Sequence, residues 1–220
     1  MNPTEGSAKP LLHCTECPRL ATFLADVRSK HRDYHARPVL PFGDPQARLL
    51  IVGLAPGMHG ANRSGRPFTG DYAGILLYET LHAFGFASQP VSVSADDGLQ
   101  LIDCRITNAV KCLPPQNKPE TDEIKTCNRW LADELTAPDV CVILALGLVA
   151  HKAVLMAAGS ALPLVGLKQS AFAFAHAARH ELPDGRVLID SYHCSRYNTQ
   201  TRRLTSADFS HVFDLIRNEL

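Results

Sequence analysis

The sequence has no excess of charge of either sign and no long apolar run. Lysine plus arginine and aspartate plus glutamate each number 22, so the formal net charge is zero. A generally cationic or anionic surface is thereby excluded, and an anionic partner must be held by local patches. No apolar run is long enough to span a bilayer, and the N-terminus lacks the apolar core of a signal peptide. We expect a cytoplasmic protein with no membrane partner.

The cysteines are odd in number, which argues against a complete disulfide framework. The chain has 7 of them and no export signal, a combination that favours metal ligation. Cys14 and Cys17 have C-x2-C spacing, and Cys112 and Cys127 flank a Pro-Pro turn. These four residues are called the cysteine quartet below. Four thiolates suit zinc or a four-iron, four-sulfur (4Fe-4S) cluster, and the residues alone leave both open. In a third interpretation Cys112 and Cys127 are only small buried residues.

Short apolar runs alternate with helical patterns, which predicts an α/β fold. At 220 residues and 45% hydrophobic content, the chain can bury the core of one domain, and we expect residues 1–220 to form it. Because each run is followed by a loop and a helix, the crossovers predict a three-layer α/β/α sandwich with a central four-stranded parallel sheet. The expected strands are residues 47–52, 104–112, 140–146 and 186–192.

A glycine-rich loop, residues 52–71, connects the first expected strand to a helix. Open parallel sheets bind their ligands beyond the carboxyl ends of the strands, which is where this loop begins. Polar loops also follow the second and fourth strands. We therefore expect these three loops to gather at one rim of the sheet and to form the functional site.

Three segments of the sequence are distinctive: GLAPGMHGANRSGRPFTGD, TNAVKCLPPQNKP and SYHCSRYNTQTRRLT. Together with the quartet, they resemble the uracil-DNA glycosylase superfamily, specifically family 5, or type B, and the resemblance extends from Cys14 to Thr205. The resemblance implies a four-stranded parallel sheet between helices and a structural 4Fe-4S cluster held by the quartet. It also implies a monofunctional DNA-repair enzyme that cuts the N-glycosidic bond of uracil. Its partner would be DNA containing uracil or other deaminated bases such as hypoxanthine, and we expect a monomer.

The resemblance assigns roles to residues in each segment. Cutting the bond leaves an electron-poor sugar and a uracil with negative charge largely on O2, so catalysis is mainly electrostatic. His193 resembles the histidine that donates to O2, and Asn108 resembles the asparagine that reads the uracil edge. Phe68 matches the aromatic residue on which the flipped base stacks. The simpler interpretations are a loop histidine with its own partners, an asparagine bonded to the backbone and a core phenylalanine.

The anionic group near the sugar is harder to assign. Other branches of the superfamily have a polar residue directly after the first strand, where this chain has Gly53, Leu54 and Ala55, which the resemblance places against the substrate. In the type B branch Asp71 is the candidate that replaces it. Asp71 precedes a helix, so the competing interpretation is an N-cap. Both roles are possible if one carboxylate oxygen bonds the helix, and helix-end donors would favour the ionised form.

The loop after the fourth strand departs from the family pattern. The superfamily's His-Pro-Ser is His193-Cys194-Ser195 here, which removes a proline that would stiffen the loop and puts a thiol near the rim, where it could react. Ser195, Arg196 and Asn198 form an expected DNA-backbone contact. The basic segment from residue 28 to 37 is either a phosphate patch or a favourable helix end.

A function of another class also fits these residues. The quartet could belong to a non-catalytic or redox iron-sulfur protein whose rim loops bind a different ligand. A redox protein would show a reversible one-electron couple and release no base, whereas a glycosylase would release free uracil.

Overall fold

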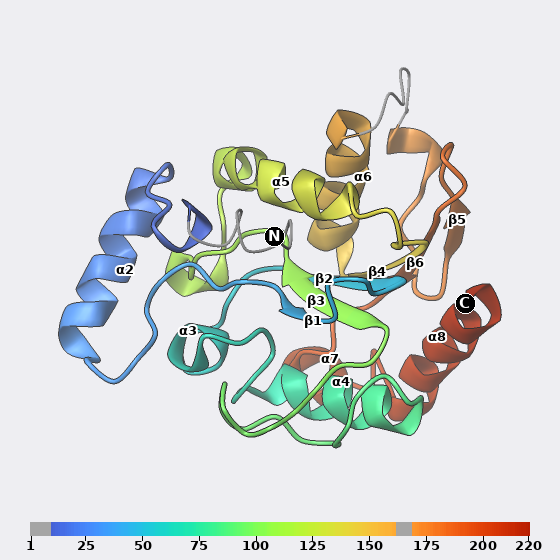
Figure 1. Cartoon of the computed structure of the whole chain (residues 1–220), viewed down its shortest axis with the longest axis horizontal. Helices are drawn as coiled ribbons and strands as arrows, with labels where there is room; N and C mark the ends of the chain where they lie inside the picture. Colours follow the sequence, from blue (N-terminus) through green and yellow to red (C-terminus); the bar gives the residue numbers. More distant parts are fainter. Residues whose placement is uncertain (1–9, 162–168) are drawn as a thin grey trace.

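A mixed sheet in the order β1-β3-β2-β4-β6-β5 forms the middle layer of the protein. The computed structural model describes residues 10–161 and 169–220 (Figure 1). The expected domain of residues 1–220 therefore includes two segments, 1–9 and 162–168, that lie outside the described residues. The strands are β1 Phe42–Gly43, β2 Leu49–Gly53, β3 Cys104–Asn108, β4 Val142–Leu146, β5 Arg179–Glu181 and β6 Val187–Ser191.

The predicted central four-stranded parallel sheet is present, and two further strands lie at its edges. The pairs β2–β3, β2–β4 and β4–β6 are parallel and correspond to the four expected strands. Two antiparallel edge strands, β1 against β3 and β5 against β6, extend the sheet to six. Strands this short are too brief to show an alternating pattern, so the sequence gives no periodic signal for them.

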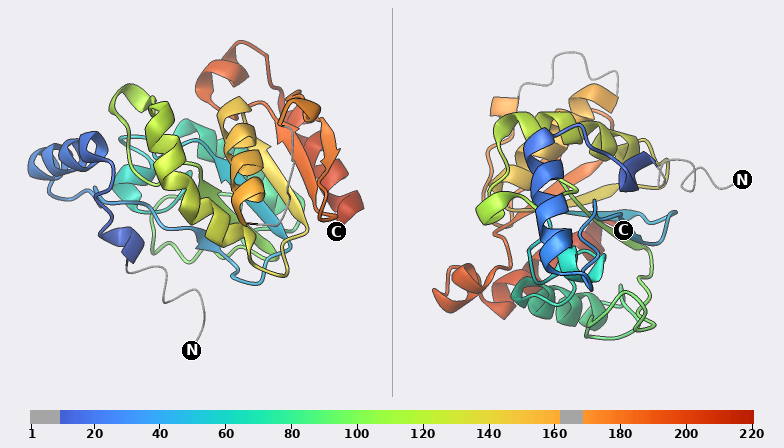
Figure 2. Two further views of the ribbon diagram at one scale, coloured as in Figure 1. Left: turned by 90° about the horizontal axis from the view of Figure 1, so that it is seen from above. Right: turned by 90° about the vertical axis from the view of Figure 1, so that its left-hand side faces the viewer.

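Helices cover both faces of the sheet, as the three-layer prediction requires (Figures 1 and 2). The helices α5 (Thr121–Leu135) and α6 (Leu148–Ala161) lie on one face, and α4 (Tyr72–Ala83) and α8 (Ser206–Glu219) lie on the other. The helix α2 (Pro18–Lys30) lies at the β1 end of the molecule. The short helices are α3 Ala61–Ser64, η1 Pro115–Asn117, η2 Gln169–Ala171 and α7 Arg196–Gln200.

The central strand β2 shows why these residues form a covered sheet. All of its residues are buried, because both faces are packed against helices. Leu49 and Ile51 belong to the apolar cluster that includes α4 and α8 residues. Leu50 and Val52 belong to the cluster that includes α5 and α6 residues. The period of two along the strand thus divides the core into two halves, one on each side of the sheet.

The helix starts follow local chemistry. Pro18 occupies the first turn of α2, as predicted, where its missing N–H leaves no hydrogen bond unmade. Glu120 and Glu123 form a capping box at the start of α5. The segment from 193 to 203, predicted as a polar loop, contains α7 instead, because Ser195 caps a short helix there. None of the helices in the described segments combines the length and apolar character that a membrane crossing requires.

Candidate active site

A pocket of about 440 Å³ lies at the carboxyl edge of the central strands. The loops after β2, β3 and β6 form it, as expected from the parallel topology. Its volume is in the usual range for small-molecule sites. Most of the predicted site residues line it: Leu54, Ala55, Phe68, Asp71, Asn108, His193, Ser195 and Arg196.

Gly53, at the end of β2, allows the pocket to close. A Cβ atom there would overlap Asn108 Oδ1 and would lie 2.6 Å from Cζ of Phe68, so no larger residue fits. Phe68 is 6% exposed and adopts a positive φ of 53°. Its carbonyl oxygen sits directly against Gly74, where a side chain would also collide. The aromatic ring is therefore fixed in place, both as part of the core and as a wall of the pocket.

Asn108 ends β3 with its side chain in the pocket. The residue is buried and lines the pocket, and its amide has no side-chain hydrogen bond among the described residues. The interpretation of an asparagine bonded to the backbone therefore finds no support. A free amide presents a donor and an acceptor together, which is what recognition of a base edge requires.

His193 follows β6 and stacks on Phe68. Their ring centroids are 5.9 Å apart with an interplanar angle of 28°. Nδ1 of His193 is buried and has no partner among the described residues, and the side chain lines the pocket. Burial lowers the pKa of His193 to about 4. The ring is therefore neutral at physiological pH and can still donate one hydrogen bond.

Asp71 caps α4, which confirms the simpler interpretation of this residue. Its Oδ1 accepts a hydrogen bond from the Gly74 N–H at 3.0 Å. Its Oδ2 lies toward the glycine-rich loop, where a Cβ atom at Gly57 would be 3.7 Å away and one at Gly60 would overlap the carboxylate. One oxygen thus bonds the helix while the other stays on the pocket side, so the cap leaves room for a second role.

Burial and the helix-end donors shift the pKa of the Asp71 carboxyl in opposite directions. Burial raises the pKa of the Asp71 carboxyl, and the N–H groups of Gly74 and Ala73 oppose this shift without cancelling it. The helix-end donors favour the ionised form, as expected, but burial has the larger effect on the pKa. Removal of water from the carboxyl group outweighs the two backbone hydrogen bonds.

The loop after His193 is held by its own polar residues. The Asn198 side chain donates to the His193 carbonyl at 2.8 Å, and Ser195 Oγ accepts from the Asn198 N–H at 3.5 Å. Asn198 is not among the pocket residues but supports the segment that carries His193. Arg196 is exposed, and its guanidinium lies 5.8 Å from the centre of the Tyr72 ring. Of the three expected DNA contacts, Arg196 and Ser195 border the pocket directly.

Cys194 is fully buried, which contradicts the suggestion of a reactive thiol. Burial raises its pKa to about 12, and the nearby Asp71 carboxylate adds to the shift. A protonated, enclosed thiol is a poor nucleophile. Cys194 therefore fills space behind the loop.

The basic segment from 28 to 37 contributes in part to the structure itself. Arg28, in the last turn of α2, donates to the Ala36 carbonyl at 2.7 Å and so ties the following turn to the helix. This contact supports the helix-end interpretation at Arg28, and the role of the other basic residues stays a prediction.

The cysteine quartet gathers from three parts of the chain around one small cavity, closed by apolar residues such as Leu20 and Trp130. Cys14 and Cys17 precede α2, Cys112 follows β3, and Cys127 lies in α5. Burial and neighbouring acidic groups raise the pKa of Cys17 to about 11.

The spacing of the quartet's sulfur atoms bears on which metal group they suit. Zn–S bonds of about 2.3 Å place the sulfurs of a tetrahedral zinc site roughly 3.8 Å apart. Within the described ranges, no three of these sulfurs lie within 4.8 Å of one another. The spacing is therefore wider than zinc requires.

Some of the residues that line the pocket are not individually predicted from the sequence. They are Gly57, Ala61, Tyr72, Ala73 and Asn117. Asn117 belongs to the loop after β3 and has a positive φ of 56°. That loop is one of the three predicted rim loops, but no pattern within it distinguishes Asn117 from its neighbours. Tyr72 follows Asp71 directly, and only the start of α4 turns its ring toward the pocket mouth.

Fold and pocket together define an α/β protein with a ligand-sized pocket between loops at the carboxyl edge of a parallel sheet. The family model described as the Uracil DNA glycosylase superfamily matches residues 40–217, so the chain belongs to that superfamily. Relatives place it more narrowly in the type-5 family.

The relatives cover almost the whole chain. A type-5 uracil-DNA glycosylase of Thermus thermophilus is 47% identical over 214 residues, with 94% of each chain covered. One from Pyrobaculum aerophilum is 40% identical over 206 residues, covering 92% of this chain and 87% of that protein. A type-4 uracil-DNA glycosylase of Sulfurisphaera tokodaii is 27% identical over 177 residues, covering 79% and 72% respectively. The resemblance stated from the motifs is confirmed.

Proposed function

We propose that the protein is a monofunctional glycosylase that excises uracil from DNA by hydrolysing the N-glycosidic bond. The observation that carries this proposal is the pocket in which Phe68, Asn108, His193 and Asp71 meet. Family membership supports it, because relatives at 40–47% identity are named uracil-DNA glycosylases.

Each of these residues suits a step of the reaction. The flipped base enters the pocket, packs against Phe68 and is read by the Asn108 amide. As the bond between N1 and C1′ breaks, the electron pair goes to the base, and neutral His193 donates to the negative charge on O2. The free oxygen of Asp71 faces the developing positive charge on the sugar. Water adds to C1′, and its proton leaves with the base, so the products are free uracil and an abasic site.

We also propose that the pocket accepts other deaminated bases, hypoxanthine included. The walls contributed by Ala55, Gly57, Ala61 and Ala73 are made of small residues, which leaves space for a two-ring base in a pocket of about 440 Å³. The donor and acceptor pair of Asn108 matches the N–H and carbonyl pattern that deamination creates on a base edge.

The cysteine quartet is proposed to hold a 4Fe-4S cluster. Convergence of four thiols on one cavity and their spacing, wider than zinc requires, support the assignment. When bound, the cluster supplies structural cross-links rather than bond cleavage. The quartet would join the start of α2 to the end of β3 and to α5, and it lies apart from the residues that line the pocket. The monomeric state stays a prediction.

The test uses oligonucleotides that carry a single uracil, hypoxanthine or xanthine, followed by alkaline cleavage at abasic sites. We expect strand scission with uracil and with hypoxanthine, and none with an undamaged strand. Scission with uracil alone would restrict the proposal to the narrower activity. No scission with any base, together with a reversible one-electron couple, would instead favour the redox protein.

A further inference from the structure

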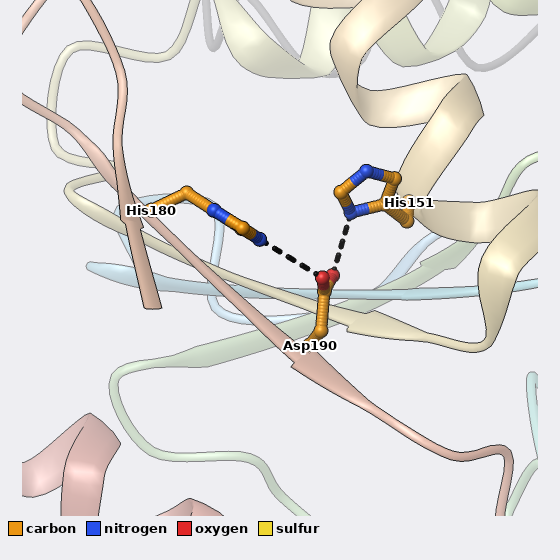
Figure 3. Close-up of side chains that lie close together, drawn as sticks. All are labelled: His151, His180 and Asp190. Carbon is orange, nitrogen blue, oxygen red and sulfur yellow. Dashed lines mark hydrogen bonds and ion pairs between the residues drawn. The ribbon is translucent and has the colours of Figure 1, made fainter. Parts of the chain in front are cut away.

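Two histidines and an aspartate meet on the face of the sheet covered by α6. Figure 3 shows His151 of α6 and His180 of β5 both pointing at the carboxylate of Asp190 in β6. His151 Nδ1 lies 2.8 Å from Asp190 Oδ1, and His180 Nε2 lies 3.2 Å from Oδ2. Asp190 is 0% exposed and His151 2%. None of the three lines the proposed active site, so that reaction does not account for them.

The second nitrogen of His151 determines what can lie between the ring and Asp190. His151 Nε2 is 3.0 Å from the Phe172 carbonyl, which can only accept a hydrogen bond, so Nε2 must carry a proton. In the neutral ring Nδ1 is then an acceptor that faces another acceptor, Asp190 Oδ1. Only a cation, either a proton or a metal ion, makes that contact favourable. Histidines that bind metals commonly have this arrangement, with the other ring N–H donated to a carbonyl.

The donor set and its spacing indicate which metal would fit. Two imidazole nitrogens and one carboxylate oxygen suit zinc and similar divalent transition metals, whereas magnesium and calcium prefer oxygen ligands. The three ligand atoms lie within 4.8 Å of one another, and no other such group occurs in the described part of the chain. In a tetrahedral site with metal–ligand bonds of 2.0–2.1 Å, the three ligand atoms would lie roughly 3.3 Å from one another. His180 is the member that can close this gap, because it lies on a three-residue edge strand.

We propose that His151, His180 and Asp190 form a structural site for a divalent transition metal, with zinc as the probe. The three ligands come from a helix, an edge strand and an inner strand, so the ion would fix the antiparallel edge of the sheet to α6. Its fourth position would be taken by water near His180, the most exposed of the three side chains at 13%. The site is independent of the proposed base-excision activity and of the cysteine quartet.

The experiment is a zinc titration of the purified protein with its cysteine site loaded, after weakly bound metal has been removed with a mild chelator. Zinc bound in competition with a chromophoric chelator, and the thermal midpoint with and without zinc, are measured for the wild type, His180→Gln and Asp190→Asn. The control is His82→Gln, because His82 is an exposed histidine on α4. We expect one zinc ion per chain and a raised midpoint in the wild type and control, with both effects lost in His180→Gln.

Zinc X-ray absorption distinguishes this site from the quartet. The proposed ligands give a nitrogen and oxygen shell at about 2.0–2.1 Å, and thiolates give sulfur at about 2.3 Å. A sulfur shell, zinc binding that persists in His180→Gln, or no zinc binding by the wild type would each overturn the proposal. Circular dichroism of the two variants checks that they are folded. If Asp190→Asn fails to fold, His180→Gln still tests the proposal. His180 is the most exposed of the three ligands, so its replacement disturbs the core least.

Discussion

Two opposing effects act on the carboxyl group of Asp71. Burial raises its pKa above the ordinary value of 3.8, and two helix N–H groups oppose that shift. A group whose folded-state pKa is raised contributes stability while it is protonated, below the unfolded-state pKa, and loses that contribution as the pH rises. Once the pH has risen above the folded-state pKa, the ionised Asp71 carboxyl therefore reduces the stability of the fold. Such a group is a candidate for function, because the fold alone would favour a neutral cap.

Asp71→Asn separates the two roles of this residue, because asparagine keeps the helix N-cap and removes the negative charge. Asparagine caps helices about as well as aspartate, so the thermal midpoint at pH 7 should equal or exceed that of the wild type. Single-turnover uracil release should fall roughly a hundredfold, since loss of one strong electrostatic contact costs on the order of 3 kcal/mol. Asp71→Ala is the matched control and should lose the cap as well, lowering the midpoint. Near-wild-type release by Asp71→Asn would end the catalytic role.

His193 should remain neutral well below pH 6. Its pKa is lowered to about 4 by burial, so its contribution to stability is present above the ordinary pKa of 6.5 and is lost as the pH falls toward 4. Nitrogen-15 NMR of labelled histidine should show a neutral ring at pH 5, and a ring that protonates near pH 6.5 would contradict the burial argument. Exposed His82 serves as the internal reference.

His193→Ala should reduce uracil release without much change in DNA affinity. The donor acts on charge that develops only as the bond breaks, so it stabilises the transition state more than the bound substrate. We expect a loss of roughly a hundredfold in single-turnover rate. His82→Ala should behave as wild type in the same assay. An equal loss of affinity and rate in His193→Ala would show that the histidine serves binding instead.

At the scale of elements, α7 presents Arg196 to the solvent beside the pocket mouth. With zero net charge, the chain must attract DNA through such local contacts. Arg196→Ala should weaken binding to damaged and undamaged duplex by similar factors and reduce the salt dependence by roughly one phosphate contact. Arg179→Ala is the control, because Arg179 lies on the edge strand β5, does not line the pocket, and is paired with Glu219 of α8. A loss confined to uracil-containing DNA would place Arg196 in base recognition.

Elements with a strong apolar period could be predicted from the sequence, and the others could not. The buried runs of β2 and β4 and the apolar face of α8 carry their own signal. The edge strand β5 has only three residues, and its pairing with β6 depends on tertiary contacts. The helix α7 could not be predicted for the same reason. It has five residues, and the Ser195 cap and the Asn198 contact hold it in place.

In the candidate site, too, residues with a signal in the sequence could be predicted, and residues placed only by tertiary structure could not. Asn108 and His193 could be predicted because the family resemblance marks both residues, and the parallel topology brings the carboxyl ends of β3 and β6 to one rim. Tyr72 reaches the pocket through the direction in which α4 begins, a three-dimensional property with no local pattern. The His151, His180 and Asp190 group was also invisible in the sequence, because its members lie 10 or more positions apart, and 39 separate His151 from Asp190.

For the whole molecule, the end of β3 links the pocket to the cysteine quartet. Asn108 reads the base in the proposed reaction, and Cys112 lies a few residues further along the same segment. The Lys111 N–H donates to Cys127 Sγ at 3.3 Å, and the buried Lys111 ammonium pairs with Glu134 at 2.6 Å. The segment that positions Asn108 is thus held at its far end by the quartet and by α5. A group bound to the quartet should therefore affect both stability and base recognition.

Cys112→Ser tests this link between the two sites. If the quartet holds the proposed 4Fe-4S cluster, the variant should lose its iron, and its thermal midpoint should fall by roughly 5–10 °C, since a tightly bound group stabilises only the folded state. Uracil release should fall as well, because the Asn108 end of the segment loses one of its supports. Cys141→Ser is the matched control, a half-buried cysteine outside the quartet, and should keep both iron and activity. If Cys112→Ser lost its iron but kept its midpoint and rate, the quartet would not support the pocket, and the Lys111–Glu134 pair alone would have to hold the end of β3.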